Sequence, residues 1–160
     1  MFNALQRTTP YRFMVLPRLV AGLPLLFFGV KHVLDPDPFR AILIASGLPL
    51  VELNVIAAPL AECVAAALLL SGFLARLGGV LGVVTMLPAI YATLTLKGLD
   101  PAHLPAGLTQ VPFVPPLPLP VVVLLSALAV LILGAGAWSV DAAVGTNGMA
   151  TMPSAPLRSR

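Results

Sequence analysis

The stretch Leu53–Phe73 holds a single charged side chain, Glu62, in a largely apolar run, LNVIAAPLAECVAAALLLSGF. A helix of about 20 such residues crosses the roughly 30 Å hydrocarbon core of a bilayer, so the run predicts a membrane-spanning helix. A carboxylate at that depth costs several kcal/mol unless it finds a partner, and such residues often serve a function. The run therefore indicates both the class of fold and its first candidate residue.

Four apolar runs are long enough to span, at about residues 13–34, 51–73, 77–96 and 117–137. Apolar residues make up 59% of the chain and charged residues 9%, against about a quarter in soluble domains. A soluble domain could not cover its surface with so few charges. We therefore predict an all-α integral membrane four-helix bundle, formed by one domain over residues 1–143 and followed by a disordered tail, 144–160.

The connections differ in length and composition. The turn around Arg76 is short, so the second and third spans should form an antiparallel pair. Ala41–Ala45 is too short to span and predicts a short helix along the outer interface, whereas the segment from Lys97 to Pro120 contains seven prolines and predicts a stiff, irregular cap.

Prolines also lie inside the first three spans, at Pro24, Pro59 and Pro88. Each removes a backbone hydrogen bond and should kink its helix. The kinks either open a small polar cavity around Glu62 or shape a closed bundle.

The distribution of basic residues predicts the orientation in the membrane, because cytoplasmic segments carry an excess of Lys and Arg. Four spans place both termini and the Arg76 turn on one side, which we assign to the cytoplasm, and Trp138 should anchor that face. The cytoplasmic side then carries Arg7, Arg12, Arg18, Arg76, Arg158 and Arg160, and the outer side carries Lys31, Arg40 and Lys97.

Depth along the spans suggests partners for the charged residues. Arg18 and Glu62 are separated by roughly 9 Å along the membrane normal at 1.5 Å per residue, which an arginine side chain nearly covers. Lys31 and Glu52 fall at similar depth near the outer side. Either both pairs neutralise buried charge, or Glu62 is free to handle protons or to bind a polar headgroup.

Several function classes lack sequence support. The basic residues are scattered, which argues against nucleic acid as a partner. A single cysteine, Cys63, leaves no disulfide pair within the chain. His32 and His103 do not suggest a haem, no cluster has metal-ligand spacing, and no cofactor site is evident. Small residues at Gly78–Gly82 offer a face for helix packing or for a homo-oligomer.

Four stretches in order resemble the DoxX family of small four-helix bacterial membrane proteins. They are RLVAGLPLLFFGVKHVLDP (Arg18–Pro36), SGLP (Ser46–Pro49), AECVAAALLLSGFLARLGGVLGVVTML (Ala61–Leu87) and GAGAWSVDAA (Gly134–Ala143). The resemblance implies a multi-pass protein of the bacterial cytoplasmic membrane. By analogy it singles out Arg18, Lys31, Glu62 and Arg76 without giving any of them a catalytic role.

The resemblance implies a membrane component of an oxidoreductase system, with a redox-enzyme partner and a quinone reached through that complex. On this interpretation the chain is an accessory subunit rather than a stand-alone enzyme. Two other classes stay open. One is a small proton-coupled transporter centred on Glu62, which would need to dimerise. The other is a structural scaffold locked by an Arg18–Glu62 ion pair.

Overall fold

The apolar runs of the sequence form helices, and the part of the chain that the structure describes contains no strand. The computed structural model describes residues 9–102 and 104–144. Its elements are the 3-10 turn η1 (Arg12–Met14) and the helices α2 (Val15–Leu34), α3 (Pro36–Ala45), α4 (Val51–Ser71), α5 (Ala75–Lys97) and α6 (Pro118–Leu133). A short helical turn follows at residues 140–144. The prediction of an all-helical protein is confirmed.

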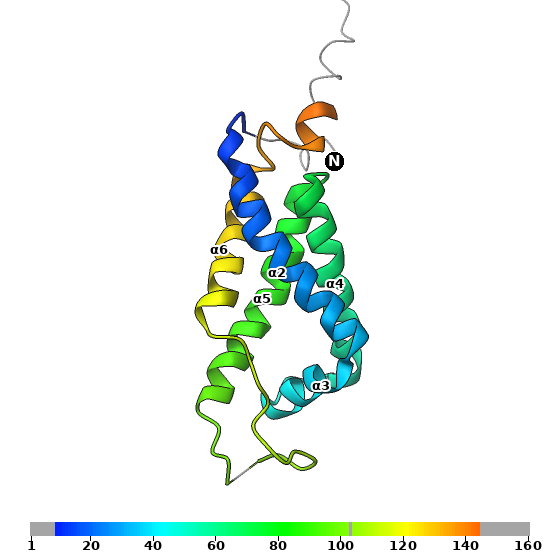
Figure 1. Cartoon of the computed structure of the whole chain (residues 1–160), viewed down its shortest axis with the longest axis vertical. Coiled ribbons are helices and arrows are strands. Elements are labelled where there is room, and N and C mark those ends of the chain that lie inside the picture. The colour runs from blue at the N-terminus through cyan, green and yellow to red at the C-terminus, as the bar shows by residue number, and fades with distance from the viewer. Residues whose placement is uncertain (1–8, 103, 145–160) are drawn as a thin grey trace, which may run out of the picture.

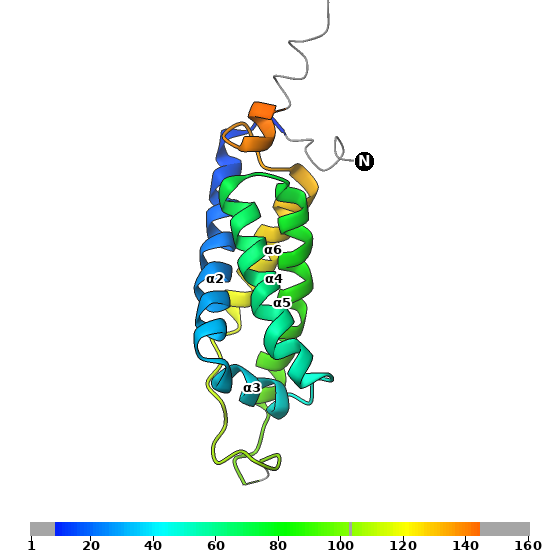
Figure 2. The ribbon, with the colours of Figure 1, turned by 90° about the vertical axis from the view of Figure 1, so that its right-hand side faces the viewer.

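Four of these helices pack side by side along the long axis of the molecule (Figures 1 and 2). Helix α2 packs on α4, α4 on α5 and α5 on α6, and α2 also contacts α6. Helix α3 lies across one end and contacts α2, α4 and α5. Three segments are long and apolar enough to cross a membrane, Arg12–Leu34, Val51–Ser71 and Ala75–Lys97, whereas α6 is apolar but shorter.

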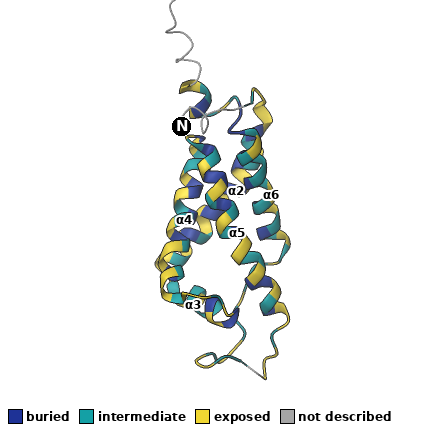
Figure 3. Cartoon of the chain, turned by 180° about the vertical axis from the view of Figure 1, so that it is seen from behind, coloured by how far each residue is buried: buried dark blue, intermediate teal, exposed yellow. Residues whose placement is uncertain are grey.

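Exposed residues lie along the outward faces of the bundle (Figure 3), and many of them are large and apolar. Phe27 on α2, Ile56 on α4 and Ile132 on α6 each expose more than 60% of their surface. Apolar exposure on every side suits lipid rather than water, because soluble monomers seldom expose large contiguous apolar patches. The chain is therefore a helical membrane protein.

Glycines of α5 bring the helices close together inside the chain. Gly78, Gly79 and Gly82 are all buried. A Cβ at Gly79 would stand 2.9 Å from the carbonyl oxygen of Ala127 on α6. The predicted use of the Gly78–Gly82 face for helix packing is confirmed, and because α2, α4 and α6 cover the face within the chain, it is not free for dimerisation.

Two boundaries differ from the predicted ones. Helix α3 begins at Pro36, because proline is favoured at the first turn of a helix, and so extends well before Ala41. Helix α6 ends at Leu133 rather than near residue 137, since Gly134 leaves the helical conformation at φ 83°. Pro24, Pro59 and Pro88 lie within continuous helices.

Both ends of the described chain meet at the end of the bundle opposite α3 (Figure 1). The Thr9 amide donates to the carbonyl of Leu133 at 3.2 Å, and the Ala137 amide donates to that of Tyr11 at 3.3 Å. Trp138 lies at the same end, 63% exposed, with the Arg12 guanidinium 5.7 Å from the centre of its ring. Such an exposed aromatic suits a membrane interface. The tail 145–160, His103, Arg7, Arg158 and Arg160 lie outside the described residues.

Candidate functional site

A mostly apolar cavity of about 470 Å³ occupies the half of the bundle nearest α3. Small-molecule sites in proteins span about 300–1,000 Å³, so this cavity is of ligand size. Its walls come from α2, α3, α4, α5, the start of α6 and the proline-rich connection that precedes it. Representative lining residues are Phe28, His32, Phe39, Ala61, Glu62, Pro88, Ala92 and Pro115.

The register of α2 against α4 explains where this space lies. Gly29 of α2 faces Glu62 and Cys63 of α4 so closely that a Cβ there would lie 3.1 Å from the Cβ of Glu62. Five residues of α2 follow Gly29, but eleven residues of α4 precede Glu62. Helix α4 therefore extends past the end of α2 by about 9 Å, at 1.5 Å per residue. Helix α3 crosses the resulting gap and covers the cavity.

Glu62 lies on the cavity wall with His32 as its neighbour. The residue is 6% exposed, and its Oε2 atom lies 3.6 Å from the Nδ1 atom of His32. That separation allows electrostatic attraction but exceeds the usual length of a hydrogen bond. Neither atom has a hydrogen-bond partner among the described residues.

Aromatic rings hold the imidazole of His32 in place. It stacks on Phe39 of α3 with ring centres 4.3 Å apart and planes 12° from parallel, and Phe28 lies one turn earlier on α2 at 6.0 Å. His32 follows Gly29 by three residues, which puts the two on one face of α2. The sequence contains that spacing, but Glu62 was predicted to pair with Arg18, so its contact with His32 was missed.

The predicted Arg18–Glu62 ion pair is wrong. The Arg18 side chain, 4% exposed, points toward the opposite end of α4 and donates from Nε to Leu69 O at 2.8 Å and from Nη2 to Leu70 O at 2.8 Å. Glu62 precedes Leu70 by eight residues, about 12 Å along the helix, which is beyond reach. The last carbonyls of a helix lack partners within it and carry its negative end, so they suit a buried guanidinium.

Arg18 also binds the segment that follows α6. Its Nη1 atom donates to Trp138 O at 2.6 Å and to Ala135 O at 3.3 Å. One side chain thereby ties together α2, the end of α4 and residues 135–138.

Asp141 binds the start of α5, much as Arg18 binds the end of α4, and the sequence analysis missed it. Its carboxylate, 2% exposed, accepts hydrogen bonds from the amides of Leu74 at 2.8 Å and Ala75 at 3.0 Å. These amides belong to the unpaired, positive end of the helix, which favours a carboxylate. The only sequence signal was its place in the segment GAGAWSVDAA.

The predicted Lys31–Glu52 pair is also wrong. Glu52 instead accepts a hydrogen bond from Arg40 of α3 at 2.9 Å, and Arg40 lies 3.8 Å from Asp37. The prediction overlooked that the first turn of α4 lies beyond the end of α2 and beside α3. Lys31 makes no ion pair within residues 9–102 and 104–144. Arg76 donates to the carbonyl of Ile132 at 3.2 Å.

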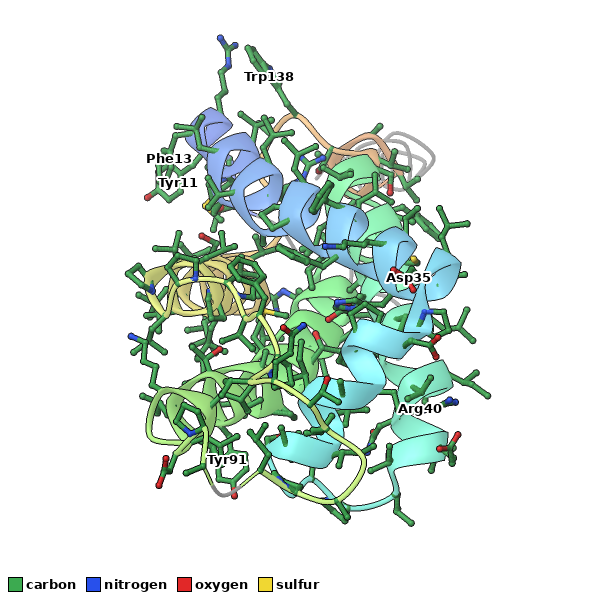
Figure 4. All side chains as sticks on the ribbon, turned by 60° about the horizontal axis from the view of Figure 1, so that its bottom comes forward. Tyr11, Phe13, Asp35, Arg40, Tyr91 and Trp138 are labelled. Atoms are coloured by element: carbon green, nitrogen blue, oxygen red, sulfur yellow. The ribbon has the colours of Figure 1, made fainter. Side chains whose placement is uncertain are left out.

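The five predicted site residues therefore divide between different parts of the molecule. Glu62 alone lines the cavity. Arg18 and Arg76 bind backbone at the end where the chain termini meet, and Lys31 and Glu52 lie apart at the other. Figure 4 shows the contrast between the ends, with Tyr11, Phe13 and Trp138 at one and Arg40 toward the other. In the described part of the chain, no three His, Cys, Asp or Glu side chains are grouped to hold a metal ion.

Comparison with known proteins finds a matching family. The family model of DoxX matches residues 13–95, just over half of the chain, from η1 to the last turn of α5. The match covers Arg18, His32 and Glu62 and stops before α6 and Asp141. No curated protein and no solved structure is detectably similar to the chain.

The first prediction separates the two roles of Arg18 and Glu62. Arg18→Glu should abolish recovery of folded protein, because it removes four hydrogen bonds from a charged donor and repels the carboxyl end of α4. Hydrogen bonds to charged groups contribute about 1.5–3 kcal/mol each. Adding Glu62→Arg should not restore folding. Size-exclusion chromatography in mild detergent would measure this, and rescue by the double reversal would contradict the geometry.

Proposed function

Because the chain belongs to the DoxX family, we propose that it is a membrane component of an oxidoreductase system and holds a quinone ring in the cavity beside Glu62. The observation that carries this proposal is that Glu62 Oε2 and His32 Nδ1 are buried, without hydrogen-bond partners among the described residues, on the wall of a largely apolar cavity of ligand size. A ligand for this cavity needs an apolar body and an oxygen that can meet two polar groups.

The lining residues fit a flat aromatic ring with polar oxygens. Phe28 and Phe39 offer aromatic surfaces, which favour stacked or edge-on contacts with another ring. Glu62 and His32 would hold a ring oxygen, while the proline-rich connection and α3 would exclude water. A bound quinone would supply two-electron redox chemistry that the side chains themselves lack. Electrons would come from a partner enzyme.

The other half of the bundle bears on the transporter alternative. There Gly79 packs on Ala127 and Leu131, and Gly78 packs on Leu68 and Leu69. A cavity that ends against such a closely packed half suits binding better than passage across the membrane. The scaffold alternative loses its motivating contact, because Arg18 and Glu62 do not meet.

We further propose that α6 is the fourth span and that both termini are cytoplasmic, in the inner membrane of a bacterium. The 16 residues of α6 cover about 24 Å at 1.5 Å per residue, and the segments on either side would complete the crossing. The cavity would then open toward the outer half of the bilayer.

Quinone binding should depend on the shape of the cavity. Ala61→Phe, which fills the space beside Glu62, should weaken binding of duroquinone at least about tenfold, since added bulk in a packed site costs roughly 1–3 kcal/mol. Leu60→Phe, on the exposed face of the same helix, is the matched control and should leave binding unchanged. Calorimetric titration of the protein in lipid nanodiscs would measure both. Absence of binding to the unmodified protein would reject the proposed function.

A redox enzyme should co-purify with the chain from native membranes in mild detergent. Glu62→Gln should lower the quinone-linked activity of that complex without changing its composition. Glu52→Gln, which changes an exposed carboxylate on the same helix, should change neither the activity nor the composition. Mass spectrometry identifies the partner. Recovery of the chain alone, or only as a homo-oligomer, would reject the role of accessory subunit.

Reporter fusions should establish the orientation. A fluorescent protein fused to the C-terminus should be bright and alkaline phosphatase at that position inactive, because the positive-inside rule places this end in the cytoplasm. Phosphatase inserted at Thr109, in the proline-rich connection, should be active. The reverse pattern would overturn the assignment.

A further inference from the structure

The polar side chains on the cavity wall differ in whether they already have a hydrogen-bond partner within the protein. Asn54 Nδ2 donates to Pro49 O at 2.8 Å, and Thr93 Oγ1 donates to Ala89 O at 2.8 Å. Thr85 likewise donates to a carbonyl of its own helix, at 3.1 Å. Only Glu62 Oε2 and His32 Nδ1 line this cavity as buried side-chain atoms without a hydrogen-bond partner among the described residues.

Leaving such atoms unpaired is costly, because a buried polar group without a partner loses its hydration and gains nothing in return. Glu62 Oε2 and His32 Nδ1 lie 3.6 Å apart, and the side chain of Glu62 is 8% exposed and that of His32 15% exposed. A single oxygen beside the pair can lie within hydrogen-bond distance of both. This arrangement points to a ligand group that satisfies the two atoms together.

The chemistry of the pair selects among such groups. When one proton sits on the two facing atoms, on either Glu62 Oε2 or His32 Nδ1, one of them is a donor and the other an acceptor. A hydroxyl group donates one hydrogen bond and accepts another, so it satisfies both atoms. A carbonyl only accepts, so it leaves the acceptor of the pair facing a second acceptor.

We therefore propose that Glu62 and His32 make the cavity selective for the reduced, hydroxyl-bearing form of its ligand, a hydroquinone, over the oxidised quinone. This inference rests on the proposed function, and it adds the redox form that the site prefers. Hydrogen bonds that involve an ionised group are roughly twice as strong as neutral ones, so an ionised Glu62 would strengthen the preference for a hydroxyl.

Binding of the two forms can be compared directly. Duroquinol and duroquinone share one carbon skeleton and differ in the hydroxyl and carbonyl groups alone. Titrated anaerobically into the full chain in lipid nanodiscs, the quinol should bind at least about tenfold more tightly, equivalent to about 1.4 kcal/mol. This measurement needs no variant and no partner enzyme.

Variants then assign the preference to the pair. In Glu62→Gln the neutral amide can donate to a carbonyl as well as accept from a hydroxyl, so the ratio of the two affinities should fall to about one. Glu52→Gln makes the same chemical change on α4 outside the cavity and should keep the ratio of the unmodified protein. Size-exclusion profiles show whether each variant is folded.

The outcomes separate this inference from the proposed function. Equal affinities for the two forms, or tighter binding of duroquinone, would overturn the inference while leaving a quinone site in place. If neither form binds, the proposed function and the inference fail together. A preference for duroquinol that survives in folded Glu62→Gln would overturn the role of the pair.

Discussion

The guanidinium of Arg18 satisfies backbone carbonyls that the bilayer cannot hydrate. In a membrane every backbone polar group needs a partner within the protein, and the last turn of a helix has carbonyls left over. Arg18 binds two of them in α4 and two more after α6. Because these bonds fix where α2 sits along α4, the positions of Gly29, His32 and Glu62 relative to one another follow from them.

That register divides the bundle into two unlike halves. Toward the chain termini, Arg18 and Asp141 bind helix ends and the glycines of α5 allow close packing. Toward α3, helix α2 ends before α4 does, and α3 crosses the space beside α4 without filling it. The cavity is thus a consequence of helix lengths and register more than of any single residue. Its polar pair comes from the two helices whose relative position Arg18 determines.

The sequence was sufficient to predict the membrane class and the helices, because an apolar run of about 20 residues has few alternatives. It was not sufficient to predict the contacts. Depth was counted from predicted helix ends, and each residue of error displaces a side chain by 1.5 Å. In the observed register Arg18 contacts Leu70 rather than Glu62, and His32 lies beside Glu62. Glu52 paired with Arg40 because α3 proved longer than its apolar core, Ala41–Ala45, suggested.

The division into two halves also separates the residues that support folding from the residues that shape the cavity. The closely packed half bears the interactions on which folding depends, whereas α3 and the proline-rich connection, with residues such as Phe39 and Pro115, border the cavity. Changes in this cover alter the shape and chemistry of the cavity while leaving the Arg18 and Asp141 contacts intact. A single scaffold of this kind can acquire new ligands at little cost in stability.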